Sequence, residues 1–142
     1  MSSVIHSDNK STYQERRKLD KLAAVQDIWE KWIETLAKLY NLNENITVDE
    51  QLVGFRDQCS FKQYIPSKPS KYGIKICTLC DSKTLYVLKT QIYPGKEQRS
   101  KPEKNQRIRV ACDLTYEYLG HNITCDNFFT SYNLGQLLLK RK

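Results

Sequence analysis

The fold is decided by residues 45–56, which read NITVDEQLVGFR. This stretch is rich in β-branched residues, contains no proline and places Ile46, Val48 and Leu52 on one side of an alternating pattern, so it predicts a β-strand. Asp49 lies at the centre of the strand. A carboxylate in a buried strand is costly unless another group pairs with it or a metal ion binds it, so Asp49 is a candidate functional residue.

A second aspartate ends a second apolar run far along the chain. Residues 123–127 read ITCDN, which repeats the pattern around Asp49 and places Asp126 after a predicted strand. Two strand-borne aspartates suit a two-metal phosphoryl-transfer site, because their oxygens can bridge hard cations roughly 3.5–4 Å apart. The alternative is that Asp126 caps a turn and Asp49 is an ordinary polar strand residue. The pattern alone leaves both interpretations open.

The composition favours one basic domain. The chain has 142 residues, a formal charge of +7 and five cysteines. A basic balance favours an anionic partner, and we expect nucleic acid and no membrane because nothing resembles an amphipathic anchor or a spanning segment. The N-terminus has no apolar signal core, so we expect an intracellular protein with reduced thiols. Cys77 and Cys80 would point to opposite faces of a strand, which argues against a zinc site.

The chain divides into three expected parts: a disordered tail over 1–11, an amphipathic helical segment over 12–44 and an α/β domain over 45–142. Thr12 and Glu15 have the spacing of a capping box at the start of a helix. The apolar positions that follow recur every three or four residues and predict one long helix, packed on the core or, alternatively, on a partner. These positions are Leu22, Val25, Trp29, Trp32, Leu36 and Leu39, with Ile33 and Tyr40 beside them.

The α/β domain has a predictable order of elements. After the first strand we expect strands at 74–80 and 85–93, a helix from 108 to Gly120, a strand at 123–126, and a last helix capped by Thr130 or Ser131. The first three strands predict an antiparallel meander, and the helix predicts a crossover that returns the fourth strand parallel to the first. This arrangement is a truncated ribonuclease H-like fold, with helices packed around the sheet, and it brings Asp49 and Asp126 onto adjacent strands.

Two basic segments are the predicted DNA contacts. Residues 57–73 interleave lysines with tyrosines and Phe61, a mixture suited to gripping phosphates and stacking on bases, although a solvated loop pinned by its aromatic side chains explains it equally well. Residues 94–107 predict a charged, exposed loop. The predicted DNA-binding residues are Lys62, Lys68, Lys71, Lys75, Lys96, Arg99, Lys101, Lys104 and Arg107.

Several longer motifs occur in a fixed order and carry a resemblance. They read VDEQLVGFR over 48–56, QYIPSKPSKYGIKI over 63–76, YPGK over 93–96 and GHNITCDNFFTS over 120–131. Over roughly residues 11–142 the sequence resembles the transposase domain of piggyBac elements and of the piggyBac transposable-element-derived proteins, which are domesticated copies.

The resemblance implies a cut-and-paste DNA transposase with a Mg²⁺-dependent, three-aspartate site, acting in the nucleus on transposon ends and TTAA targets. Asp49 matches the first catalytic, metal-binding aspartate and Asp126 the second. The family's third aspartate lies far downstream of the second, whereas this sequence stops at Lys142. We therefore expect a fragment that binds Mg²⁺ weakly or not at all and is catalytically inactive alone.

Two other functions stay open. The chain could be a non-catalytic module that binds DNA, a full-length transposase or a second copy of itself. It could also be an active nuclease in which Glu50, Asp81 or Asp113 supplies the third carboxylate. The resemblance further predicts an unpaired strand edge over 122–129 that exposes Phe128 and Phe129.

Overall fold

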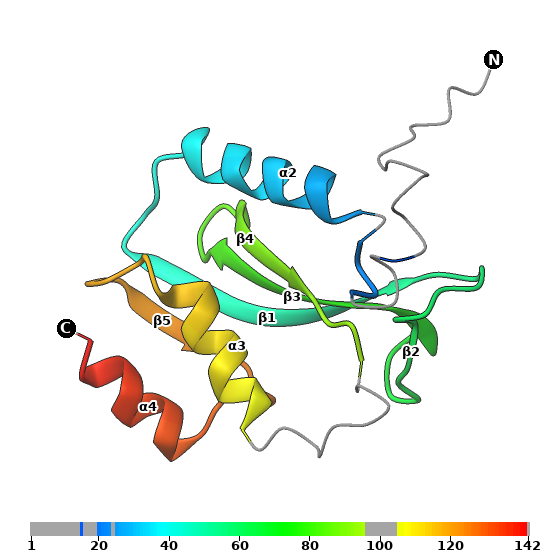
Figure 1. Ribbon diagram of the computed structural model, residues 1–142. Helices are drawn as coiled ribbons and strands as arrows, with labels where there is room; N and C mark the ends of the chain where they lie inside the picture. Colours follow the sequence, from blue (N-terminus) through cyan, green and yellow to red (C-terminus); the bar gives the residue numbers. More distant parts are fainter. Residues whose placement is uncertain (1–14, 16–19, 24, 96–104, 142) are drawn as a thin grey trace.

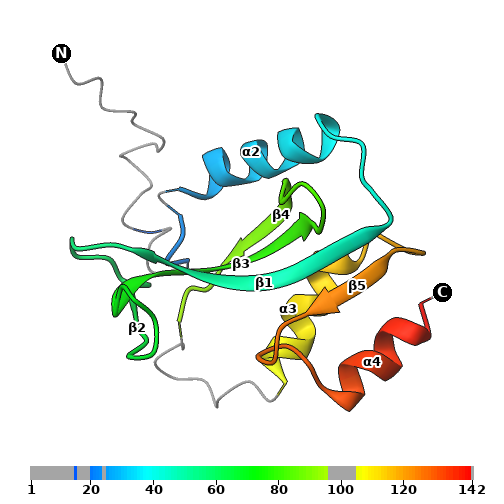
Figure 2. The same ribbon diagram turned by 180° about the vertical axis from the view of Figure 1, so that it is seen from behind.

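The computed structural model describes residue 15 and residues 20–23, 25–95 and 105–141. A mixed five-stranded sheet has helix α2 on one side and helices α3 and α4 on the other (Figures 1 and 2). No helix within these ranges is long and apolar enough to cross a membrane. The elements are α2 Gln26–Lys38, β1 Asn45–Gly54, β2 Gln63–Tyr64, β3 Tyr72–Asp81, β4 Val87–Ile92, α3 Gln106–Thr115, β5 Asn122–Cys125 and α4 Tyr132–Leu139.

The sheet is built around β1 and β3. β1 pairs with β3 in antiparallel and with β5 in parallel, while β3 also pairs in antiparallel with β4 and β2. The predicted meander is therefore confirmed as β1-β3-β4, and the predicted return of the last strand beside the first is confirmed by β5. Helix α3 makes the crossover between β4 and β5 (Figure 1). The short strand β2 is an addition, because its segment was expected to be irregular.

The core fills the space between the sheet and helices α3 and α4. Ile46 and Val48 of β1 are fully buried, whereas Asp49 is exposed, as the alternation of β1 predicts. Each fully buried aliphatic side chain of this kind contributes about 1.5–3 kcal/mol relative to an exposed one. The buried cluster consists of Ile46, Val48, Cys77, Leu79, Leu88, Val110, Ala111, Cys112, Leu114, Phe129 and Leu134.

The N-terminal helix is shorter than the sequence predicts. Residues 21–23 form a turn, and α2 begins at Gln26. The carboxylate of Asp20 accepts a hydrogen bond from the Leu22 N–H at 2.8 Å, a local contact that competes with helix formation. Thr12 of the predicted capping box, and the whole tail over 1–11, lie outside the described residues.

Helix α2 is also less buried than its apolar stripe predicts. None of its residues is fully buried. Trp29 and Leu36 are half-buried, and the Tyr86 hydroxyl donates to the Leu36 carbonyl at 3.0 Å, which ties α2 to the start of β4. Core packing therefore accounts for one side of the stripe only. The exposed apolar residues of this segment are Val25, Ile28, Trp32 and Leu39.

The last two helices begin and end for local reasons. Helix α3 ends at Thr115 rather than near Gly120, and Gly120 instead has a φ of +80° in the turn that leads into β5. Helix α4 is capped by Ser131, whose hydroxyl accepts the Leu134 N–H at 3.2 Å. Ser131 is one of the two caps that the sequence predicts.

Candidate active site

Asp49 in β1 and Asp126 directly after β5 occupy neighbouring positions where two parallel strands stop pairing. The last paired residues of β1 and β5 are Val48 and Cys125, and the two aspartates come directly after them. The two segments are far apart in the sequence. At the start of the same ladder, Asn122 donates a side-chain hydrogen bond to Asn45, which lies 77 positions earlier. The predicted juxtaposition of the two strands is therefore present, while the role of the two carboxylates stays a prediction.

Both carboxylates are exposed to solvent, so neither pays the cost of an unpaired buried charge. Asp49 Oδ1 accepts the Glu50 N–H at 2.7 Å. Asp126 Oδ1 accepts the N–H groups of Phe128 and Phe129 at 3.1 and 3.2 Å. Among the described residues no hydrogen bond reaches the Oδ2 atom of either aspartate, so each keeps one oxygen available to a cation.

Asp126 also holds a turn, as the alternative interpretation of the sequence predicts. Its backbone carbonyl accepts the N–H and the hydroxyl of Thr130 at 3.0 and 2.7 Å. The turn contacts at the Asp126 side chain use only Oδ1. Turn formation and metal binding are therefore compatible at this residue.

The two phenylalanines after Asp126 anchor its turn, and the prediction that both are exposed is wrong. Phe129 is 1% exposed and belongs to the core. Phe128 is half-buried, with the Lys75 ammonium 3.7 Å and the Arg107 guanidinium 5.1 Å from its ring centroid. Arg107 also donates to the Phe128 carbonyl at 3.1 Å. These contacts fix the backbone that presents Asp126, because cations bind the faces of aromatic rings.

Glu50 forms a nearly buried ion pair beside Asp49. Its side chain is 10% exposed and pairs with Lys75, which is 12% exposed, and more weakly with Lys68 at 3.5 Å. By the two-residue alternation of a strand, Glu50 lies on the same side of β1 as Val48, and Lys75 on the same side of β3 as Cys77. Opposite charges on the core-facing side of two strands were the sequence signal for this ion pair. Glu50 is thus committed to two lysines rather than free to act as a third metal ligand.

Two thiols near the site have raised pKa values, chiefly because they are buried. Burial raises the pKa of Cys77 to about 11; Lys75 opposes this shift, while Glu50, Asp126 and Asp49 add to it. Burial, with a smaller effect of Asp126, likewise raises the pKa of Cys125 to about 11. Glu50, Asp49 and Asp126 therefore all lie close enough to Cys77 to influence its charge.

Asp81 is a structural residue rather than a metal ligand. It is fully buried, and its oxygens accept the backbone N–H groups of Asn43, Lys83 and Thr84 at 2.9–3.0 Å. Burial alone would raise the pKa of Asp81, but the hydrogen bonds from Thr84 and Asn43 outweigh it and hold the pKa well below its usual range. Asp81 thereby ties the segment before β1 to the β3–β4 turn.

Asp113, the remaining candidate for a third carboxylate, pairs with Arg109 at 3.0 Å along α3 and is exposed. Within the described ranges, no three or more His, Cys, Asp and Glu residues are grouped to hold a metal ion. The candidate site therefore consists of Asp49 and Asp126.

The predicted DNA-binding residues fall into three groups. Lys96, Arg99, Lys101 and Lys104 lie outside the described residues. Lys68 and Lys75 pair with Glu50, and Arg107 contacts Phe128. Lys62 donates to the Asp57 carbonyl at 3.0 Å, and Lys71 is exposed.

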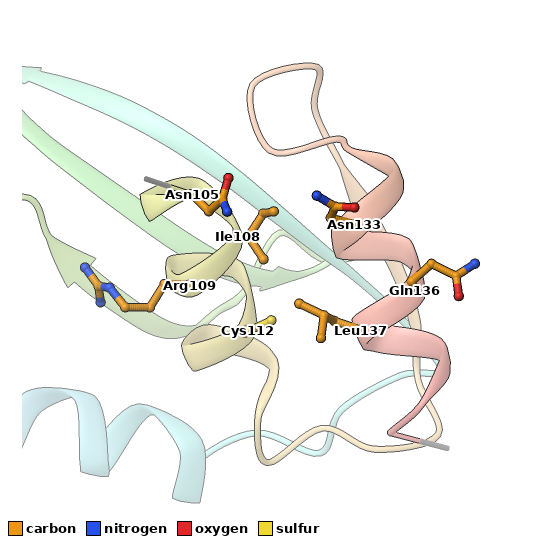
Figure 3. A pocket seen from close by; sticks show the side chains of 7 residues that line it. All are labelled: Asn105, Ile108, Arg109, Cys112, Asn133, Gln136 and Leu137. Carbon is orange, nitrogen blue, oxygen red and sulfur yellow. The ribbon is translucent and has the colours of Figure 1, made fainter. Parts of the chain in front are cut away.

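A shallow groove of about 530 Å³ lies between α3 and α4 (Figure 3). Ile108, Cys112 and Leu137 form its apolar part, and neither candidate aspartate lines it. Its remaining lining residues are Asn105, Arg109, Asn133 and Gln136.

Comparison with known proteins decides the family. Residues 1–142 match a family model described as Transposase IS4. The chain belongs to this transposase family. It is of the piggyBac type, as its motifs predict. The chain is similar to piggyBac transposase, with 40% sequence identity and a TM-score of 0.84. The compared structure is a cryo-EM structure of the piggyBac transposase synaptic complex with hairpin DNA. The match covers 93% of this chain and 28% of the piggyBac transposase chain, so this transposase-family chain spans less than a third of that protein.

Proposed function

We propose that the chain forms part of the catalytic core of a cut-and-paste DNA transposase, in which Asp49 and Asp126 are two of the carboxylates that hold divalent metal ions. The observation that carries the proposal is their adjacency at the ends of the β1–β5 ladder, each with Oδ2 free of hydrogen bonds in the described residues. The β1-β3-β4 meander with β5 parallel to β1 supports the finer assignment of a ribonuclease H-like fold.

The donor set fits Mg²⁺, which prefers carboxylate and water oxygens in near-octahedral geometry. Asp49 and Asp126 would hold the ion through Oδ2, while the turn after Asp126 keeps Oδ1 in place. When bound, such ions activate water and neutralise charge on a phosphate during an in-line displacement.

The proposed partner is DNA, in the nucleus, with transposon ends and TTAA targets as the substrates that family membership suggests. The formal charge of +7 supports an anionic partner, and the similar piggyBac transposase was solved with hairpin DNA. A full-length transposase or a second copy of the chain is the proposed protein partner.

We infer that these residues alone do not cleave DNA. Glu50 is paired with lysines, Asp81 is saturated by hydrogen bonds and Asp113 is paired with Arg109. Further oxygen ligands are therefore required before two metal ions can be placed for in-line displacement.

Metal titration tests the proposal. Mn²⁺ should broaden the NMR signals of the wild-type chain around residues 48–50 and 125–128, and Asp49→Asn or Asp126→Asn should abolish this effect. Asp113→Asn is the matched control, because it removes an exposed carboxylate from α3. Broadening that survives both site variants would overturn the metal assignment. Mn²⁺-dependent nicking of plasmid DNA that Asp49→Asn removes would overturn the inference that the chain is inactive alone.

The second candidate function is a non-catalytic DNA-binding module. It is favoured by the basic segment over 57–73, which carries three basic side chains and one acidic side chain. DNA binding that is unchanged in the Asp49→Asn/Asp126→Asn variant, together with no metal binding in the wild type, would select this function over the first.

A further inference from the structure

Two tyrosines form an exposed aromatic pair at one end of the sheet. Tyr64 of β2 and Tyr72 of β3 face each other across the strands, with ring centroids 4.7 Å apart. They are 56% and 58% exposed, although aromatic rings usually bury much of their area. β2 lies far from α3 and α4 in both ribbon views (Figures 1 and 2). We call this pair the tyrosine platform.

One cation, Lys62, lies beside the tyrosine platform, and two more, Lys71 and Arg56, belong to the adjoining segments. The Lys62 ammonium lies 6.0 Å from the Tyr72 ring centroid, and its hydrogen bond to the Asp57 carbonyl holds the preceding loop in place. Lys71 and Arg56 are exposed, and neither side chain makes a hydrogen bond or ion pair among the described residues. An exposed aromatic pair with cations on the same segments is complementary to a nucleic acid strand, which offers flat bases and phosphates together.

We propose that the tyrosine platform stacks on unpaired bases of single-stranded DNA while Lys62 and Lys71 hold the adjacent phosphates. The proposal rests on the proposed DNA partner and adds the form of DNA that this surface recognises. Stacking requires the face of a base, which a continuous duplex hides between neighbouring base pairs, so the platform should prefer single strands. Every base has such a face, so we expect no sequence preference.

The platform lies on the same sheet as the candidate active site and at a distance from it. Tyr72 precedes Gly73, which pairs with Gly54 at the end of β1, whereas Asp49 pairs with Thr78. The five residue steps from Asp49 to Gly54 span about 17 Å of strand. Stacking at the platform is therefore separable from metal binding at the aspartates.

Binding in EDTA tests the proposal without any contribution from a metal site. Fluorescence anisotropy would compare a labelled, mixed-sequence single strand with its duplex for the wild type, Tyr64→Leu, Tyr72→Leu, and the corresponding Phe variants. Tyr132→Leu is the matched control, because Tyr132 is 81% exposed on α4. Each Leu variant should weaken single-strand binding by about 5- to 100-fold, the Phe variants should bind as the wild type does, and Tyr132→Leu should have no effect.

Salt dependence separates stacking from charge. Lys71→Gln should lower the slope of log K against log salt by about 0.7 on single strands, whereas the Leu variants should leave it unchanged. Since the platform also packs β2 on β3, an NMR titration of the wild type is the complementary measurement, and the Tyr64 and Tyr72 ring signals should shift with single strands.

Three results would overturn the proposal: equal affinity of the wild type for single strands and duplex, equal losses for both DNA forms in the Leu variants, or unshifted ring signals. Failure here leaves the Mn²⁺ experiment unaffected, because that experiment reads the Asp49 and Asp126 carboxylates in the absence of DNA. Conversely, if the wild-type chain stacks on single strands but does not bind Mn²⁺, only the catalytic assignment is overturned.

Discussion

Replacing Lys75 with methionine removes the cation nearest to Glu50 and keeps an unbranched side chain of similar length. The Glu50 side chain is 10% exposed, and removing one partner of a buried ion pair costs roughly 3–5 kcal/mol. Lys68 remains 3.5 Å from Glu50 but is one-third exposed, so it offsets about 1 kcal/mol. The lost cation–π contact with Phe128 is partly replaced by a sulfur–aromatic contact. We therefore expect Lys75→Met to lower the free energy of unfolding by about 2–4 kcal/mol.

Urea denaturation followed by circular dichroism measures this effect. Lys89→Met is the control, because Lys89 also lies in a strand but pairs with the exposed Glu117 at 3.7 Å, a contact worth about 0–1 kcal/mol. The double variant Glu50→Leu/Lys75→Met removes both charges and should be more stable than Lys75→Met alone, giving a coupling energy of about 2 kcal/mol or more.

Two results would refute this reasoning. Equal free energies of unfolding for Lys75→Met and Lys89→Met would show that Glu50 is well solvated and would contradict the buried pair. Additive effects of Glu50→Leu and Lys75→Met would show that the two side chains do not interact. Because Lys75 also contacts the Phe128 ring, the Asp126 turn should loosen in Lys75→Met, which amide exchange at Phe128 and Phe129 would detect.

Three further predictions concern local structure. Gly73→Ala should lower the free energy of unfolding by about 1–3 kcal/mol, because the new Cβ would lie 2.2 Å from a backbone oxygen of β1. In Gly135→Ala of α4 the new Cβ meets no atom within 4 Å, so this variant should raise the free energy of unfolding by about 0.5–1 kcal/mol. If both variants change the free energy of unfolding in the same direction in urea denaturation, the register of β1 against β3 at Gly73 is contradicted. The pKa of Asp81 is depressed on folding, so its contribution to stability is complete above the ordinary value of 3.8 and is lost as pH falls below it. The urea midpoint should therefore fall more steeply with acid in the wild type than in Asp81→Asn, and parallel curves would refute the role of this carboxylate. The pKa values of Cys77 and Cys125 are raised to about 11, so both thiols should resist iodoacetamide at pH 8 in the folded chain and react in urea, as mass spectrometry would show.

Local patterns were sufficient for every strand except β2 and for the presence, although not the full extent, of the last two helices. The alternation around Val48 depends on the two-residue repeat of a strand, which acts over neighbouring residues and is visible in the sequence. The same holds for the Ser131 cap, which depends on a contact three residues away. The predicted length of the N-terminal helix was wrong for an equally local reason. The Asp20 carboxylate accepts the Leu22 N–H and favours a turn, although the apolar repeat continues through this segment.

The family, the sheet order and the approach of Asp49 to Asp126 follow from sequence patterns and motifs. The surroundings of the two aspartates do not, because they depend on side chains brought together from distant segments. Folding places Lys75 of β3 against Glu50 of β1 and Phe128 after β5, buries Phe129 in the core and commits Asp81 to Asn43. The sheet register decides which side chains of neighbouring strands meet. The tertiary structure alone therefore decided which carboxylates are paired and which remain free to bind a cation.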